Sequence, residues 1–121
     1  MANTFKQINF AAEPASAGTP YVMYTVASST TTIIIGLLLT NIHTSAVTTE
    51  IELVSTTANR GGNNSVTNGT SFLVKDVSIP VGSTLELLSG GKVVLEAGDK
   101  LQIDCSVADK LSGSLSVLEI T

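Results

Sequence analysis

The fold is decided by residues 77–121, VSIPVGSTLELLSGGKVVLEAGDKLQIDCSVADKLSGSLSVLEIT, in which short apolar runs alternate with turn residues. The turn signals are Pro80-Val81-Gly82, Ser89-Gly90-Gly91, Ala97-Gly98-Asp99 and Leu111-Ser112-Gly113. Turns spaced roughly 8–12 residues apart between β-rich runs are typical of a sandwich or barrel. Residues 77–121 therefore predict short antiparallel strands, and nothing in them resembles a reaction centre.

The remainder of the chain extends this pattern to the N-terminus. No helix is predicted, and strands are predicted over residues 4–10, 21–27, 32–42, 47–54, 71–79, 84–89, 92–96, 100–107 and 114–120. A chain of 121 residues suits one domain. We predict an all-β, single-domain antiparallel β-sandwich, jelly-roll-like, with about eight or nine strands. Residues 21–121 form the predicted sandwich domain, and residues 1–20 form either an N-terminal arm or a first strand with a flexible connection.

The most apolar element is residues 32–42, TIIIGLLLTNI. It lacks a clean alternation, which favours a strand that is covered on both faces, and the second cover could be a neighbouring subunit. Gly36 inside it indicates a bulge or a close approach of backbone. We therefore predict a core or subunit interface made by Ile33, Ile34, Ile35, Leu37, Leu38 and Leu39.

Charged residues are scarce, because Asp, Glu, Lys and Arg make up 13% of the chain, and the formal net charge is −4. Serine and threonine fill 30 of the 121 positions, and threonine favours strands. An acidic chain with scattered basic residues is unsuited to nucleic acid, and the longest apolar run is far too short to span a membrane. We therefore predict neither nucleic acid nor membrane as a partner. A surface with few charges is typical of a subunit of an oligomer or assembly.

The sequence contains few side chains suited to catalysis or to metal binding. Cys105 is the only cysteine and His43 the only histidine, whereas a structural zinc site needs four such ligands. Cys105 alternates with Leu101 and Ile103 and is predicted in the core, so catalysis with His43 would need a long-range coincidence. One cysteine allows no internal disulfide, and the opening MANTFKQ lacks a signal-peptide pattern. We predict no catalytic residue, no metal and no cofactor, and synthesis in a reducing cytoplasm.

The dipeptide Gly91-Lys92 resembles part of a phosphate-binding motif that the neighbouring residues do not complete. Gly91-Lys92 looks like the end of a phosphate-binding loop, but that pattern needs glycine at position 86 and serine or threonine at position 93. Those positions hold Glu86 and Val93, so a hairpin turn explains the motif better.

Residues 55–70 form the longest polar stretch and are predicted to face solvent or a partner.

Several of these segments resemble small β-rich virion proteins of tailed bacteriophages. The resemblance is carried by residues 79–83 (IPVGS), 94–101 (VLEAGDKL) and 116–121 (SVLEIT), with residues 24–32 (YTVASSTTT) upstream. It spans roughly residues 20–121 and rests on turn and strand signatures, not on catalytic ones.

The resemblance implies a structural subunit that is not an enzyme. The family includes capsid decoration, or cement, proteins, which are often trimeric jelly rolls, and neck or tail accessory proteins. We expect a decoration protein that is made in the host cytoplasm, lies on the capsid surface of the virion, and binds the major capsid protein and copies of itself as a homotrimer. The alternatives are a neck, tail or fibre-associated component and a host-surface or glycan-binding module. The last is weakened because the chain has no tryptophan and few other aromatic residues.

Overall fold

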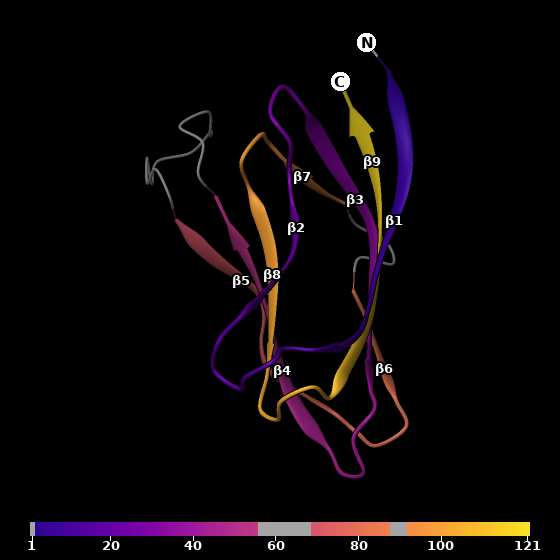
Figure 1. The fold of residues 1–121 in the computed structure, drawn as a ribbon, viewed down its shortest axis with the longest axis vertical. Coiled ribbons are helices and arrows are strands. Elements are labelled where there is room, and N and C mark those ends of the chain that lie inside the picture. The colour runs from indigo at the N-terminus through magenta and orange to yellow at the C-terminus, as the bar shows by residue number, and fades with distance from the viewer. Residues whose placement is uncertain (1, 56–68, 88–91) are drawn as a thin grey trace.

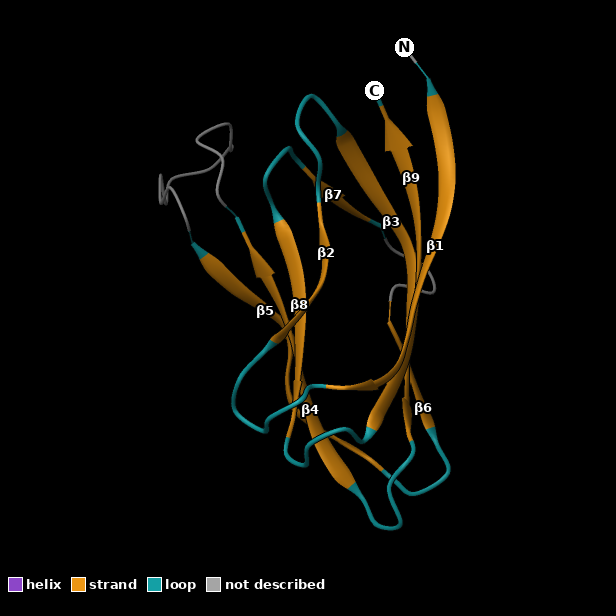
Figure 2. Cartoon of the chain, in the orientation of Figure 1, coloured by secondary structure: helices purple, strands orange, loops and turns teal. Residues whose placement is uncertain are grey.

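Two layers of strands make up the part of the chain described by the computed structural model, which is residues 2–55, 69–87 and 92–121 (Figure 1). Within these ranges there are nine strands and no helix (Figure 2), so the all-β prediction is confirmed. The strands are β1 (Asn3–Glu13), β2 (Tyr21–Thr25), β3 (Thr31–Asn41), β4 (Val47–Val54), β5 (Thr70–Ile79), β6 (Thr84–Leu87), β7 (Val93–Leu95), β8 (Lys100–Cys105) and β9 (Leu111–Ile120). The predicted hairpin turn at 89–91 and most of the polar loop 55–70 lie outside the described residues.

The strand order is that of a jelly roll. One sheet runs β1-β9-β3-β6, with β7 also paired to β3, and the other runs β2-β8-β4-β5; every pair is antiparallel. β6 and β7 pair with successive parts of β3, so together they occupy one strand position. Four antiparallel pairs then follow one another along a single long hairpin, in the order β1·β9, β2·β8, β3·β6/β7 and β4·β5. Folding that hairpin over places β9 beside β3 and β8 beside β4, which confirms the predicted sandwich.

The core lies between the two sheets and is filled by alternate residues of each strand. In β8, Leu101, Ile103 and Cys105 point inward while the residues between them face outward. In β9, the odd-numbered residues from Leu111 to Val117 are buried in the same way. This alternation is the pattern from which the strands are predicted, and it places the Cys105 side chain in the core.

A bulge in β3 explains why its sequence does not alternate. Thr32 and Ile34 point into the core before the bulge, and Leu37 and Leu39 point into it afterwards. The register against β9 shifts between Ile34 and Gly36, which is one extra residue on the β3 side. A Cβ atom at position 36 would meet nothing within 4 Å. Of the two alternatives predicted for Gly36, the bulge is therefore present and the close approach is not.

The turn predicted at residues 111–113 is wrong. Leu111, Ser112 and Gly113 are the first residues of β9, and the chain turns before them, where Asp109 has a φ of 57°. Gly113 pairs with Phe10 of β1, and a Cβ atom there would lie 2.3 Å from Phe10 Cε2. The glycine leaves room for the Phe10 ring inside a strand, and this need for space cannot be told from a turn by sequence alone.

The N-terminal residues 3–13 form a strand of the sandwich. β1 pairs with β9 from Asn3 opposite Ile120 to Glu13 opposite Leu111. The N- and C-terminal residues lie side by side (Figure 1), and Ala2 and Thr121 exchange two backbone hydrogen bonds. The described N-terminal segment is thus the first strand, followed by a connection over residues 14–20 that contains a single bridge between Ser16 and Thr19.

Candidate functional site

The outer face of the β1-β9-β3-β6 sheet carries a row of apolar side chains. The register places Phe5 opposite Leu118, Leu118 opposite Ile33, and Ile33 opposite Val94. Directly opposed residues of antiparallel strands point to the same face, so these four side chains cross the sheet from β1 to β7. Phe5 is 74% exposed and Val94 57% exposed, and Ile33 and Leu118 are half-buried between them. We call these four residues the apolar row.

Uncharged polar side chains and two further apolar ones continue this face. Gln7 lies opposite Ser116, and Asn9 opposite Ser114. Gln7 Nε2 donates to Ser114 Oγ at 3.0 Å, and the Thr40 and Thr84 hydroxyls lie 2.9 Å apart. A shallow hollow of about 300 Å³ between β3, β6 and β9 is lined in part by Ile35 and Leu38. Hydroxyl, amide and aliphatic groups therefore surround the apolar row.

We name this outer surface the low-charge face. Its outward residues are Asn3, Phe5, Gln7, Asn9, Thr31, Ile33, Ile35, Leu38, Thr40, Thr84, Glu86, Val94, Ser112, Ser114, Ser116, Leu118 and Ile120. Glu86 lies on the edge strand β6, and Glu96, which follows β7, accepts from the Thr31 hydroxyl at 3.4 Å, so the two carboxylates lie along one edge of the face. The rest of the face offers apolar contact area with little charge to desolvate.

The outer face of the opposite sheet differs in kind. Lys75 Nζ lies 2.9 Å from Glu50 Oε1, and Gln102 Nε2 donates to Glu52 Oε2 at 2.6 Å. Lys75 also lies 4.6 Å from the centre of the Phe72 ring. We call this surface, made by the outward residues of β8, β4 and β5, the charged face. The ion pairs on it are solvent-exposed, and such pairs keep a surface soluble more than they stabilise it.

A polar cluster joins the two sheets at the end where the chain termini lie. Tyr24 Oη of β2 lies 2.8 Å from Thr32 Oγ1 and donates to Glu119 Oε2, while Lys6 Nζ lies 2.8 Å from Glu119 Oε1. Burial, and then the hydrogen bond to Glu119, raises the pKa of Tyr24 to about 12. The hydrogen bonds from Lys6 and then from Tyr24 hold the pKa of Glu119 below its usual value. The cluster is satisfied internally and connects the two sheets.

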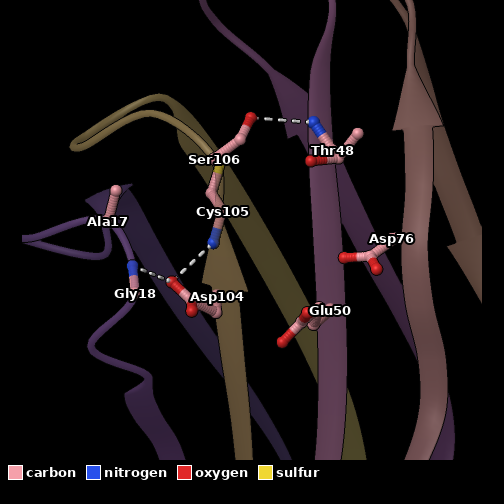
Figure 3. A pocket seen from close by; sticks show the side chains of 8 residues that line it. All are labelled: Ala17, Gly18, Thr48, Glu50, Asp76, Asp104, Cys105 and Ser106. Carbon is pink, nitrogen blue, oxygen red and sulfur yellow. Dashed lines mark hydrogen bonds between the residues drawn. The ribbon is translucent and has the colours of Figure 1, made fainter.

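A pocket of about 220 Å³ lies beside the ends of β4 and β8, and Figure 3 shows its lining. Asp104 Oδ1 accepts from the Gly18 amide at 3.1 Å and from the Cys105 amide at 2.8 Å. Ser106 Oγ accepts from the Thr48 amide at 3.0 Å. The polar atoms of this pocket are thus largely used to hold the residue 14–20 connection and the strand ends in place.

No reactive pair or metal cluster is assembled in the described residues. Cys105 is 4% exposed, and the backbone of His43 is held by Asn41 in the turn after β3. Across residues 2–55, 69–87 and 92–121, no group of three or more His, Cys, Asp or Glu side chains could hold a metal ion. The same residues contain no helix long and apolar enough to cross a membrane.

Of the six residues predicted as core or interface, three lie in the core and three lie on the low-charge face. Ile34, Leu37 and Leu39 lie in the core, and Ile33, Ile35 and Leu38 belong to the low-charge face. Sequence analysis missed Phe5, Leu118 and Val94, which complete the apolar row. Each occupies an outward position in a predicted strand, but only the pairing of the strands shows that they are neighbours.

Comparison with protein-family models, with curated proteins and with solved structures finds no match for this chain.

Proposed function

We propose that this chain is a structural subunit of a bacteriophage particle, and specifically a capsid decoration protein that binds the outside of the major capsid shell. The observation that carries the proposal is the low-charge face, an exposed sheet surface with an apolar row, which is typical of a subunit that works in an assembly. Contiguous apolar surface of this kind marks a contact site. The jelly-roll fold supports the proposal by analogy, since viral capsid proteins use it repeatedly.

Such a protein works through binding energy alone. A subunit that binds the closed shell, and not its dissociated parts, stabilises the shell in proportion to the logarithm of its free concentration over the dissociation constant. Burial of apolar area supplies this binding energy at about 25 cal/mol per Å². The proposed partners are the major capsid protein and other copies of the chain, the latter as a homotrimer, and the proposed location is the capsid surface.

The proposal is tested by adding the purified protein to shells that lack it. We expect the protein to sediment with the shells in a fixed ratio and to raise their melting temperature. Shells that are already fully decorated are the control and should take up no more. A protein that stays in the supernatant and leaves the melting temperature unchanged would contradict the proposal.

Copy number separates this role from that of a neck, tail or fibre-associated component. Decoration of a shell needs hundreds of copies in each particle, on the order of the number of capsid subunits, whereas a tail part needs far fewer. Densitometry of purified virions against the major capsid band measures this ratio. Jelly rolls also occur in lectins, so specific binding on a glycan array would favour a glycan-binding module over a decoration protein.

A further inference from the structure

We propose that the low-charge face is the contact between copies of this chain, and that the protein associates with itself through this face in solution. The inference rests on the two sheet faces and their register, so it holds whether or not the particle is a phage shell. The molecule that covers the low-charge face is a second copy of the chain, and the charged face stays exposed to solvent.

The distribution of charge on the chain favours a second copy as the molecule that covers the low-charge face. The chain carries ten acidic against six basic residues, so two copies repel each other wherever their charged surfaces meet. Like charges brought together in an interface are costly. Of the two outer sheet faces, the low-charge face lets two acidic copies approach with less repulsion, because its carboxylates, Glu86 and Glu96, lie at one edge. A basic partner would instead be drawn to the charged face, where Glu50, Glu52 and Asp104 lie.

The chemistry of the face is self-complementary. The Ser114 and Ser116 side chains point outward along β9 between the apolar row and the level of Ser112, which lies opposite Thr40 and in line with Thr84. A hydroxyl group both donates and accepts a hydrogen bond, so it can bond to an identical group on another copy. A face built only from carboxylates or only from ammonium groups would lack this property.

The area of the face is sufficient for a specific contact. β9 has ten residues, which span about 33 Å at roughly 3.3 Å per residue. Four strand positions at a spacing of about 4.8 Å cover about 19 Å, which gives a flat area of roughly 600 Å². Side chains make the accessible area larger than the flat area, so it approaches the ~800 Å² per partner of a standard protein interface.

Sedimentation equilibrium with two matched lysine variants tests the proposal. Val94→Lys places a charge in the apolar row, and Val22→Lys places the same charge on the outer side of the edge strand β2 in the opposite sheet. Both valines are exposed, at 57% and 41%. We expect the wild type to sediment with the mass of at least two chains of 12.5 kDa. Val94→Lys should weaken the association at least about tenfold, and Val22→Lys should leave it unchanged.

Three results would overturn the inference. They are a wild type that stays monomeric at concentrations up to ~100 μM, equal weakening by the two variants, and weakening by Val22→Lys alone. Circular dichroism and melting curves show whether each variant is folded, and Phe5→Lys offers a second substitution in the apolar row if Val94→Lys is not. A chain that self-associates through this face but does not bind shells would keep this inference and remove the proposed function.

Discussion

The phenol of Tyr24 donates a hydrogen bond of 2.5 Å to Glu119 Oε2, and so joins β2 of one sheet to β9 of the other. Thr32 Oγ1 and Lys6 Nζ complete the cluster, at 2.8 Å from Tyr24 Oη and from Glu119 Oε1 respectively. Thr32 is 0% exposed and the Glu119 side chain 12% exposed, so this polar connection between the sheets is largely shielded from water.

Replacing Tyr24 by phenylalanine should destabilise the protein, because Glu119 loses a hydrogen bond while the ring still fills its place. We expect Tyr24→Phe to lower the free energy of unfolding by about 1–3 kcal/mol, measured by urea denaturation. Tyr21→Phe is the matched control on the same strand. The Tyr21 ring packs edge-on against Phe10, with ring centres 5.3 Å apart, and removing its hydroxyl should change the free energy by less than ~0.5 kcal/mol. Equal losses in the two variants would contradict the role given to the Tyr24 hydroxyl.

The same cluster predicts how stability changes in alkali. The pKa of Tyr24 is raised from 10.0 to about 12 in the folded protein. Its stabilising contribution is therefore fully present below pH 10 and is lost as the pH rises from 10 to about 12. The urea midpoint of the wild type should fall toward that of Tyr24→Phe over this interval. A difference in urea midpoint between the wild type and Tyr24→Phe that stays constant up to pH 12 would contradict the raised pKa of Tyr24.

Glu119 gives the corresponding prediction in acid. Its pKa lies below the ordinary value of 4.5 in the folded protein, so its contribution is present above pH 4.5 and is lost as the pH falls below it. Glu119→Gln keeps the shape of the side chain and removes this titration. The wild type should lose stability more steeply than Glu119→Gln below pH 4.5, measured by urea midpoints. Parallel curves for the two proteins would contradict the assignment.

Two glycines of neighbouring strands should differ in how much an alanine substitution destabilises the protein. A Cβ atom at position 113 would lie 2.3 Å from Phe10 Cε2 and 3.1 Å from Leu39 Cδ2, whereas one at position 36 meets nothing within 4 Å. Gly113→Ala should cost about 1–3 kcal/mol, as overpacking of a core does. Gly36→Ala should change the free energy of unfolding by less than ~1 kcal/mol. A larger loss of stability in Gly36→Ala than in Gly113→Ala would contradict the difference in free space between the two positions.

Asn41 should be the most sensitive polar residue at the opposite end of the sandwich. It is 3% exposed, and its Nδ2 donates to Ser45 O and to Ile79 O, both at 2.9 Å. Its Oδ1 accepts from the His43 amide at 2.7 Å. Asn41→Ala leaves these groups without a partner and should cost about 2–4 kcal/mol in urea denaturation. Thr44→Ala, an exposed change in the same turn, is the control, and a similar cost there would contradict the prediction.

Sequence patterns predict the strands well where one face is buried. Leu101, Ile103 and Cys105 alternate with polar residues, and β8 follows this pattern directly. Residues 32–42 carry no such alternation, because the bulge at Gly36 changes the inward positions from even to odd numbers. The run of isoleucines and leucines is apolar enough to place it in the sheet, but it does not show which three of the six side chains face outward.

The candidate site could be predicted from the sequence only in part, because the apolar run 32–42 indicates Ile33 but not the residues beside it. Phe5, Ile33, Val94 and Leu118 come from four strands spread over nearly the whole chain. Only the nested pairing of a jelly roll brings them into one row, and pairing between distant strands leaves no local signal. Gly113 shows the converse error, since a glycine needed for space beside Phe10 looks like a turn residue when the partner strand is not known.

The central claim is that the low-charge face is buried against another molecule when the protein acts, and its three phenylalanines test this most directly. In the single chain Phe5 is 74% exposed, Phe72 on the charged face is 48% exposed, and Phe10 in the core is 9% exposed. With fluorophenylalanine incorporated, quenching of each ¹⁹F signal by a soluble paramagnetic probe reports solvent access. In the assembled protein we predict that Phe5 is protected like Phe10 while Phe72 remains accessible, and that dilution exposes Phe5 again. A Phe5 signal that is quenched more strongly than that of Phe72 at every concentration, and also in the presence of shells, would contradict the claim.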